Sequence, residues 1–334
     1  MNQREIAKAM GVSQSTVSLV MSDHGTHHVS TEMRLRIMDF AGKVNYHVRP
    51  QVQALKHVVM LINGIPDLSD SYYQAYQQGV EAQAAAHDIE LSIKSHRGDI
   101  EQTLDRMPQK SGLILQQFFQ EKDISQASAR FPTMLLNYMP PLDTPPCDLV
   151  IPDFQSMMRL ALGHLKERGH RRICFWALQP KGGVNASWHL RETVNAFISS
   201  MRNLDLDGEG SIILPVAVER TREEIRREFV KTLEANLKLE RPFTAFISHG
   251  YIYALEMPGA AASLGVKIPE KIAVIGCDNV EASAYSNPPL TCANYDRHEM
   301  GRQAIDALIL RAQDRSRPPK TILCPPTLII RGST

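Results

Sequence analysis

The chain has 334 residues and a formal net charge of +1; 43% of the residues are hydrophobic and 22% are charged. This length and composition are typical of a globular protein with two or three domains. The sequence has no N-terminal apolar run and no stretch long enough to cross a membrane, so we expect neither a signal peptide nor a membrane anchor. Five scattered cysteines without a Cys-x-x-Cys pair indicate a reducing compartment, and we expect a cytoplasmic location.

Positive charge is concentrated at the start of the chain. Residues 1–57 hold seven Lys or Arg and four Asp or Glu, which gives +3, whereas the remaining 30 basic and 32 acidic residues give −2. A small basic segment in front of a near-neutral body is typical of a protein that contacts phosphates through that segment.

Two short helices with a tight turn between them are predicted in this basic segment. Asn2 and Glu5 have the spacing of a capping box at the start of the first helix. Gly11 suits the positive φ of the turn, and Ser13 is placed to cap the second helix, 14–21. Apolar side chains fall on one face of each helix: Ile6, Ala9 and Met10 in the first, Val17 and Val20 in the second.

The second helix begins with the polar side chains Gln14, Ser15 and Thr16, at the end where a recognition helix meets base edges. Ser30 is placed to cap a third helix, whose inward residues are Met33, Ile37 and Phe40. This order predicts a helix-turn-helix that reads DNA. The alternative is a helical bundle without a ligand, in which the polar residues only cap the helix.

Residues 4–22 resemble the signature of the LacI family of bacterial transcription repressors. The matching segments are Ile-Ala at 6–7, Gly-Val-Ser at 11–13 and Thr-Val-Ser at 16–18. The resemblance implies that Gln14 and Ser15 read bases, and that phosphates are touched by Ser13, Thr16, Ser18 and Ser22. A Gln14 amide paired with an adenine edge is worth about 1–3 kcal/mol of discrimination.

Two features of this head depart from the family pattern. Leu19 stands where the family usually has a base-contacting Arg; it cannot bond a guanine but can touch a thymine methyl, so we expect a different operator preference. The turn before the third helix, 23–28, is longer than usual and holds His24, His27 and His28. We interpret these histidines as an exposed loop, with a metal site as the alternative.

The family resemblance also implies a hinge at 47–57 that folds on operator DNA and wedges a Leu into the minor groove. Asn45 and Tyr46 match the start of this segment, and Leu55 stands at the wedge position. Pro50 is displaced by two residues from the family pattern, and the linker after Leu55 is short. The alternative for Leu55 is ordinary packing in the linker.

From residue 58 onward, short apolar segments alternate with amphipathic stretches, which predicts parallel sheets covered by helices. We predict helices over 72–86, 156–167 and 224–236 and about ten strands; nine of these are placed at 58–62, 89–94, 112–116, 133–137, 172–177, 211–214, 243–248, 271–276 and 321–323. The sequence contains no Gly-rich phosphate loop, no Gly-x-Ser-x-Gly and no paired metal-ligand spacing, so we expect neither an enzyme nor a bound cofactor or metal.

The body also resembles the LacI family. The segments that carry this resemblance are 72–81, 169–173, 268–279, 288–291 and 325–334. It implies an α/β fold: an N-terminal all-α helix-turn-helix head (1–46), the hinge (47–57), and a periplasmic-binding-protein-like core (58–334) of two doubly wound parallel-sheet subdomains. We place the N-subdomain at about 58–152 and 291–320, and the C-subdomain at about 153–290 and 321–334.

The resemblance further implies an effector site in the cleft between the subdomains. Asp278 matches a cleft Asp that binds hydroxyl or amine groups; the alternative is that it only caps a loop. Trp188 lies where relatives place contact residues and could stack on a sugar ring, or belong to the core instead. The remaining candidates are Ser71, Tyr72, Tyr73, Gln116, Arg191, Thr193 and His249.

Two departures weaken a sugar-binding interpretation. Sugar-binding relatives carry an Arg where this chain has Thr193, with Arg191 two places earlier, and they carry Asn-Asp where it has His249-Gly250. Two groups that bind hydroxyls are therefore missing. The effector could be another sugar, a sugar derivative or a different molecule, and loss of switching is a further alternative.

Together these features predict a sequence-specific repressor whose partners are pseudo-palindromic double-stranded operator DNA, a small-molecule effector such as a carbohydrate, and a second copy of the chain. We expect a homodimer, and the sequence leaves a tetramer and corepression open. The rival from another class is a solute-binding receptor whose head is incidental. An enzyme with an unrecognised site has no positive support.

Overall fold

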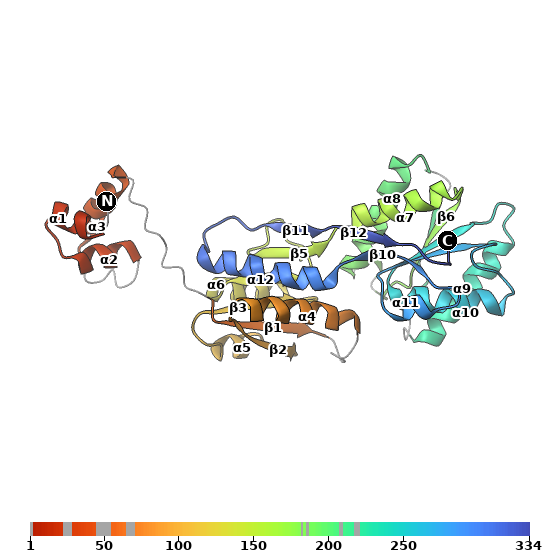
Figure 1. The fold of residues 1–334 in the computed structure, drawn as a ribbon, viewed down its shortest axis with the longest axis horizontal. Coiled ribbons are helices and arrows are strands. Elements are labelled where there is room, and N and C mark those ends of the chain that lie inside the picture. Colours follow the sequence, from red (N-terminus) through yellow and green to blue (C-terminus); the bar gives the residue numbers. More distant parts are fainter. Residues whose placement is uncertain are drawn as a thin grey trace. The chain divides into compact units, whose positions relative to one another are not determined.

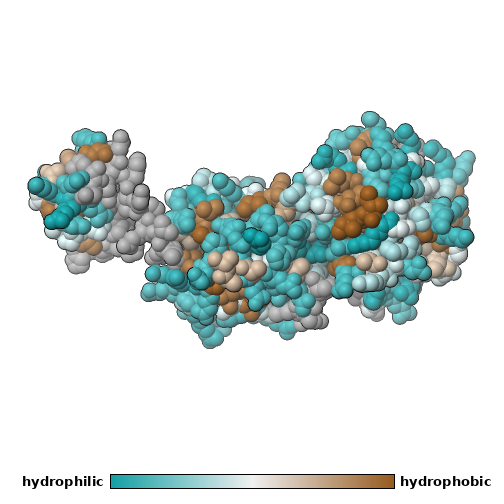
Figure 2. Space-filling view, in the orientation of Figure 1, coloured by the Kyte–Doolittle hydropathy of each residue, from teal (hydrophilic) through white to brown (hydrophobic). Residues whose placement is uncertain are grey.

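A computed structural model describes residues 3–22, 29–44, 55–64, 71–181, 183–184, 187–206, 210–216 and 221–334. The chain divides into two compact units, a small one that contains helices α1 to α3 and a large one that contains two six-stranded sheets (Figure 1). On the face of the large unit that Figure 2 shows, most side chains are hydrophilic, and the apolar ones gather in a few groups.

The head consists of α1 (Gln3–Met10), α2 (Gln14–Ser22) and α3 (Thr31–Lys43). Gly11 has φ +67° in the turn, and Ser13 Oγ accepts from the Thr16 N–H at 3.0 Å, so the predicted turn and cap are confirmed. The Met33 N–H likewise donates to Ser30 Oγ at 3.3 Å. The buried side chains of the three helices are Ile6, Ala7, Val17, Val20, Ile37 and Ala41.

The predicted inner face of α1 was wrong at one position: Ala7 is buried and Ala9 is exposed. Ala9 stands three residues after Ile6 and Ala7 three residues before Met10, so each flanks the Ile6–Met10 stripe and the spacing favours neither. Asn2 and the 23–28 turn with its three histidines lie outside the described residues.

The first sheet of the large unit has the order β11-β5-β4-β3-β1-β2, and all its strands run parallel. Its strands are β1 (His57–Asn63), β2 (Glu90–His96), β3 (Ser111–Gln116), β4 (Thr133–Leu136), β5 (Asp148–Pro152) and β11 (Thr321–Cys324). Its helices are α4 (Ser71–Ala86), α5 (Glu101–Asp105), α6 (Glu121–Arg130) and α12 (Arg297–Gln313). Helices α4 and α12 approach closely through Gly79 and Gly301, where a Cβ would meet the other helix's backbone.

The second sheet has the order β12-β10-β9-β8-β6-β7, with β12 antiparallel to β10 and the other pairs parallel. Its strands are β6 (Ile173–Trp176), β7 (Gly210–Ile213), β8 (Ala245–Ser248), β9 (Ala273–Cys277), β10 (Thr291–Tyr295) and β12 (Pro326–Ile329). Its helices are α7 (Phe154–Glu167), α8 (Trp188–Asn203), α9 (Arg222–Leu237), α10 (Tyr251–Ser263) and α11 (Ala282–Tyr285). The predicted doubly wound α/β class is confirmed.

The chain passes between the two sheets three times: from β5 to α7, from β10 to α12, and from β11 to β12. Two predicted subdomain boundaries were therefore wrong. Strand β10 lies in the second sheet although 291–320 was assigned to the N-subdomain, and β11 lies in the first sheet although 321–334 was assigned to the C-subdomain. The chain crosses to the other sheet after β10 and after β11, whereas the predicted boundaries placed these crossings before the two strands.

Three strands were missed in the sequence: β5, β10 and β12. Each is only four or five residues long, and each lies beside prolines that indicate loops, such as Pro145-Pro146 and Pro288-Pro289. Within the described residues no helix is long and apolar enough to span a membrane, and no group of three His, Cys, Asp or Glu side chains is placed to hold a metal ion.

Candidate functional site

The N-terminal end of α2 forms a polar surface on the head. Gln14 and Ser15 are exposed there. Ser13 Oγ lies 2.6 Å from Ser15 Oγ and 2.8 Å from Thr16 Oγ1, so three hydroxyls surround the first turn of the helix. A helix N-terminus carries free N–H groups and a partial positive charge, which suits contact with phosphate.

The other predicted DNA contacts are less fully placed. Ser18 and Leu19 are half-buried on α2, and Ser22 ends the helix, with its side chain outside the described set. Tyr46 also lies outside the described residues. Leu55 is only 7% exposed and stands two residues before β1, which favours the alternative of linker packing; its wedge role stays a prediction.

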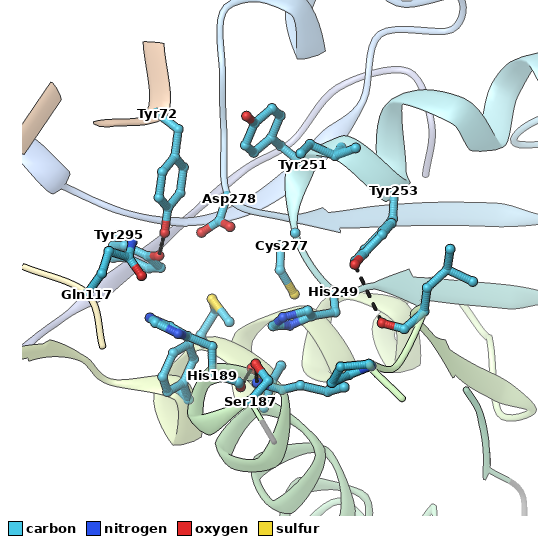
Figure 3. Close-up of a pocket in the computed structure, with 18 of the residues that line it drawn as sticks. Tyr72, Gln117, Ser187, His189, His249, Tyr251, Tyr253, Cys277, Asp278 and Tyr295 are labelled. Atoms are coloured by element: carbon cyan, nitrogen blue, oxygen red, sulfur yellow. Dashed lines mark hydrogen bonds between the residues drawn. The ribbon is translucent and has the colours of Figure 1, made fainter. Parts of the chain in front are cut away.

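A pocket of about 260 Å³ lies at the carboxyl ends of strands from both sheets of the large unit. Its aromatic lining consists of Tyr72, Tyr73, Phe154, Tyr251, Tyr253 and Tyr295. Its polar lining consists of Gln117, Ser187, His189, Thr193, His249 and Asp278. Because loops after parallel strands meet at this edge, side chains far apart in the sequence converge (Figure 3).

Asp278 is the charged group of this pocket among the described residues. It follows β9 directly with φ 71°, and its Oδ1 lies 3.9 Å from Arg297 Nη1. Burial raises the pKa of the Asp278 carboxyl, and the Arg297 guanidinium opposes that rise. The positive charge of Arg297 therefore offsets part of the cost of burying the Asp278 carboxylate, and this carboxylate can accept hydrogen bonds.

Two tyrosine hydroxyls lie beside Asp278. The hydroxyl oxygens of Tyr72 and Tyr295 share a hydrogen bond of 2.7 Å (Figure 3). Burial and the Asp278 charge raise the pKa of both phenols, so they remain neutral. The Tyr72 ring stacks on Tyr251 with centroids 5.7 Å apart and planes inclined by 20°, and it also covers the Arg297 guanidinium at 4.8 Å.

A second polar link joins the loops of the two sheets through Asn137, whose Nδ2 also donates to the Tyr72 hydroxyl at 3.5 Å. His189 Nε2, from the start of α8, lies 3.1 Å from Oδ1 of Asn137, which follows β4. Burial lowers the pKa of His189 to about 4, so the ring is neutral at pH 7 and its Nε2–H donates to Asn137. Thr193 Oγ1 donates to the His189 carbonyl at 2.6 Å and fixes the first turn of α8.

Five of the nine predicted effector contacts line this pocket: Tyr72, Tyr73, Thr193, His249 and Asp278. Gln116 does not: it ends β3 with its side chain fully buried, and the next residue, Gln117 with φ 71°, reaches the pocket instead. The side chain of Ser71, at the start of α4, lies outside the described set.

Trp188 and Arg191 were also predicted to contact the effector, but both side chains lie outside this pocket. Trp188 is 8% exposed and packs edge-on against Phe154 and Tyr138, which is the core alternative. Arg191 pairs through Nε with Glu192 Oε1 at 2.9 Å. Helix α8 turns its His189 and Thr193 face to the pocket, and neither side chain lies on that face.

Several lining residues were not predicted, among them His189, Tyr251, Tyr253 and Tyr295. Tyr251 comes two residues after His249, and the rule that ligands bind beyond the carboxyl ends of strands would have included it. Tyr295 ends the missed strand β10. His189 had no local signal, because its role depends on contact with Asn137 in the other sheet's loops.

Comparison with known protein families gives two matches on this chain. The model for bacterial regulatory proteins of the lacI family matches residues 3–48, and the model for the periplasmic binding protein-like domain matches residues 162–334. The chain therefore belongs to the lacI family of bacterial regulatory proteins and carries a periplasmic-binding-protein-like domain. It is a DNA-binding transcription regulator of the helix-turn-helix type with an effector-binding domain, in a family of regulators that are not enzymes.

Individual relatives extend along nearly the whole chain. The HTH-type transcriptional regulator GanR of Bacillus subtilis is 26% identical over 339 residues, covering 99% of this chain and 98% of GanR. The HTH-type transcriptional repressor CytR of Escherichia coli K12 is also 26% identical, over 343 residues, covering 99% of this chain and 95% of CytR.

Solved structures share the fold over the same extent. The lac repressor dimer bound to operator and the anti-inducer ONPF superposes with a TM-score of 0.67 at 19% identity, covering 100% of this chain and 99% of that one. The complex of the transcriptional regulator CelR with cellobiose gives a TM-score of 0.68 at 18% identity, covering both chains fully.

Proposed function

We propose that this protein is a homodimeric repressor whose affinity for a pseudo-palindromic operator is modulated by a small hydroxylated molecule, a sugar or sugar derivative, bound between the two sheets. In this proposal residues 1–46 read DNA, 47–57 form the hinge, and the rest binds effector and partner. The lac repressor, which shares the fold, forms a dimer on its operator. Two heads related by a twofold axis match two operator half-sites.

The exposed start of α2 supports the DNA-reading role. Gln14 and Ser15 are exposed at the start of the helix, while Ser13 and Thr16 present hydroxyls beside the helix N-terminus. We assign base reading to the first pair and, with Ser18 and Ser22, phosphate contact to the second. Arg4, Lys8 and Arg36 are exposed on the head and add positive charge for the phosphate backbone.

The observation that carries the effector role is the Asp278 carboxylate beside the paired Tyr72 and Tyr295 hydroxyls, inside a pocket lined by aromatic rings. A carboxylate accepts hydrogen bonds from two neighbouring hydroxyls of one ligand, and aromatic rings pack on the apolar face of a sugar ring. CelR, which has the same fold, binds cellobiose.

The position of the pocket gives a route from ligand to DNA. Tyr72 and Gln117 come from the first sheet's loops, whereas His249 and Asp278 come from the second's. A ligand that touches both sets changes the balance between open and closed arrangements of the sheets by its difference in affinity for the two. The first sheet follows the proposed hinge directly in sequence, and in this proposal a change in the position of that sheet is the signal to the head.

Selection of bound sequences from random and genomic DNA with the full chain tests this proposal. We expect enrichment of a pseudo-palindrome, and a change in affinity for it when a sugar handled by the proteins that neighbouring genes encode is added. Equal affinity for the enriched site and random DNA at physiological salt would show a solute-binding receptor instead. Specific DNA binding that no small molecule alters would retain the operator role and contradict the effector role.

A further inference from the structure

We propose that the pocket selects an uncharged ligand that combines hydroxyl groups with a flat apolar face, and that it rejects the phosphorylated or carboxylated form of the same ligand. The inference rests on the proposed function, since it names the chemical class of the effector.

The formal charge of the pocket lining is negative. Among the described residues that line the pocket, Asp278 carries the formal charge, and neither a Lys nor an Arg is present. Sites for phosphates and carboxylates normally present an Arg, a Lys or the backbone N–H groups of a helix N-terminus. The start of α10 lines this pocket, but a helix N-terminus carries only about half a positive charge against the full charge of Asp278. Here an anionic group would instead approach an existing carboxylate.

Arg297 is close to the pocket, yet its positive charge is already engaged. Its guanidinium is 3.9 Å from the Asp278 carboxylate, donates through Nη2 to the Asn279 carbonyl, and is covered by the rings of Tyr72 and Tyr295. The residue is 8% exposed and does not line the pocket. Arg297 therefore offsets the Asp278 charge from outside the lining, where a ligand in the pocket does not contact it directly.

Three further ionisable side chains of the lining, Tyr72, Tyr295 and His189, are neutral at pH 7. Burial and the Asp278 charge raise the pKa of Tyr72 and Tyr295, so both phenols stay protonated. Burial lowers the pKa of His189 to about 4, so its ring supplies no cation at neutral pH. These groups act as neutral donors and acceptors, which suits hydroxyls.

Aromatic rings provide apolar surface in the pocket. Tyr72 stacks on Tyr251 and covers Arg297, while Tyr73 and Tyr253 also line the pocket. Figure 3 shows Tyr253 and His249 on the side of the pocket away from Tyr295. Flat rings pack on a sugar's C–H face or on a planar heterocycle with little conformational cost. The pocket thus offers hydroxyl partners at Asp278 and His189 and apolar surface between them.

Matched pairs of probes test the inference on the full chain. The pairs are D-glucose with glucose 6-phosphate and with glucuronate, D-ribose with ribose 5-phosphate, and adenosine with adenosine monophosphate. Thermal shift and then titration calorimetry give Kd for each member. We expect at least one neutral member to bind, with its anionic partner at least about 100-fold weaker, which corresponds to about 2.7 kcal/mol. An anionic member that binds as tightly as its neutral partner, or more tightly, overturns the inference.

Two variants locate the discrimination in this pocket. Ile252→Arg adds a cation at a lining position that is 43% exposed, and should strengthen binding of the anionic member at least tenfold; Leu237→Arg, 40% exposed and outside the lining, is the matched control. Asp278→Asn should reduce the difference in Kd between the neutral and the anionic member of a pair. Glu192→Gln, which removes a carboxylate outside the lining, should leave that difference unchanged. Equal effects of a lining variant and its control contradict the inference.

The outcomes also separate this inference from the proposed function. If an anionic probe binds and alters operator affinity, the effector role stands and the uncharged class is wrong. If a neutral probe binds in preference to its anionic partner but leaves operator affinity unchanged, the class stands and the switching role is wrong. If no probe binds at millimolar concentration, both are rejected.

Discussion

The head and the effector pocket place their functional groups in opposite ways. In the head, Gln14 and Ser15 stand exposed on one short helix, and six small or medium apolar side chains hold the three helices together. In the pocket, the groups come from loops of two sheets and depend on one another: Asp278 on Arg297, and Tyr72 on Tyr295. A substitution on the head surface should therefore change one contact, whereas a substitution in the pocket should change several.

The largest effect that separates the two regions is expected in the core of the head. Ile37 is fully buried among α1, α2 and α3, and Ile37→Ala should cost about 2–5 kcal/mol, enough to unfold a unit of this size. Operator binding should be lost while ligand binding by the large unit persists. Leu35→Ala on the same helix, 63% exposed, is the control and should bind operator normally. Loss of both activities in Ile37→Ala would contradict independent units.

The head was the part best predicted from the sequence, because its signals are local. Gly11 has the positive φ that the turn requires, Ser13 and Ser30 cap α2 and α3, and Val17 and Val20 are buried. Each of these follows from spacing within one helix or turn. The single error on the inner face, Ala9 for Ala7, arose because the two alanines flank the Ile6–Met10 stripe on opposite sides, so the helical period alone does not decide which one packs inward.

The pocket was predicted only in part, because its contacts join distant segments. Asp278 and Tyr72 were found through the family resemblance, and the rule that ligands bind beyond the carboxyl ends of strands would have added Tyr251. His189 and Tyr295 could not be found in this way. His189 depends on a contact with Asn137, 52 residues away. Tyr295 ends β10, a strand that was missed because the two prolines before it indicate a loop. Trp188 is a residue type that often stacks on sugar rings, but here it is buried because it packs against Phe154 and Tyr138.

Stability should depend on pH through His189 in the large unit. Its pKa is about 4 in the folded protein against 6.5 for an exposed His, so between these values the unfolded chain binds a proton that the folded one does not. Stability should therefore fall as pH decreases from 6.5 towards 4, by at most about 3 kcal/mol. Asp278, with a raised pKa, contributes with the opposite sign.

His189→Gln isolates this contribution, because a Gln amide keeps a donor for Asn137 Oδ1 without titrating. Urea unfolding of the large unit between pH 4 and 7 should show a flatter pH dependence in the variant, while head unfolding is the same in both proteins. His164 and His170 also have lowered pKa values from burial and remain in both proteins, so the difference reports on His189. If stability depended on pH equally in both proteins, the proton taken up on unfolding would belong to a group other than His189.

In the pocket, Asp278→Ala should remove the response to effector and leave operator affinity without effector unchanged. The variant loses a charged acceptor and leaves Arg297 without its carboxylate, so ligand affinity should fall by about 1.5–3 kcal/mol. Operator titrations without and with effector measure the operator affinity and the response to effector. Glu281→Ala, an exposed carboxylate three residues away, should respond like the unmodified protein. An unchanged response in Asp278→Ala would remove this residue from the site.

On the head surface the expected effect is smaller and confined to one base position. Gln14 is exposed at the first residue of α2, so Gln14→Ala should cost little stability and remove at most one pair of base contacts, about 1–3 kcal/mol of discrimination. Affinity for random DNA and its salt dependence should stay the same, because the phosphate contacts of the neighbouring hydroxyls and basic side chains remain. Selection of bound sequences by both proteins measures this directly. A uniform loss of affinity across all sequences would assign Gln14 to the phosphate backbone, and the head would then read bases through Ser15 and Leu19, from which a preference for thymine at the matching position should follow.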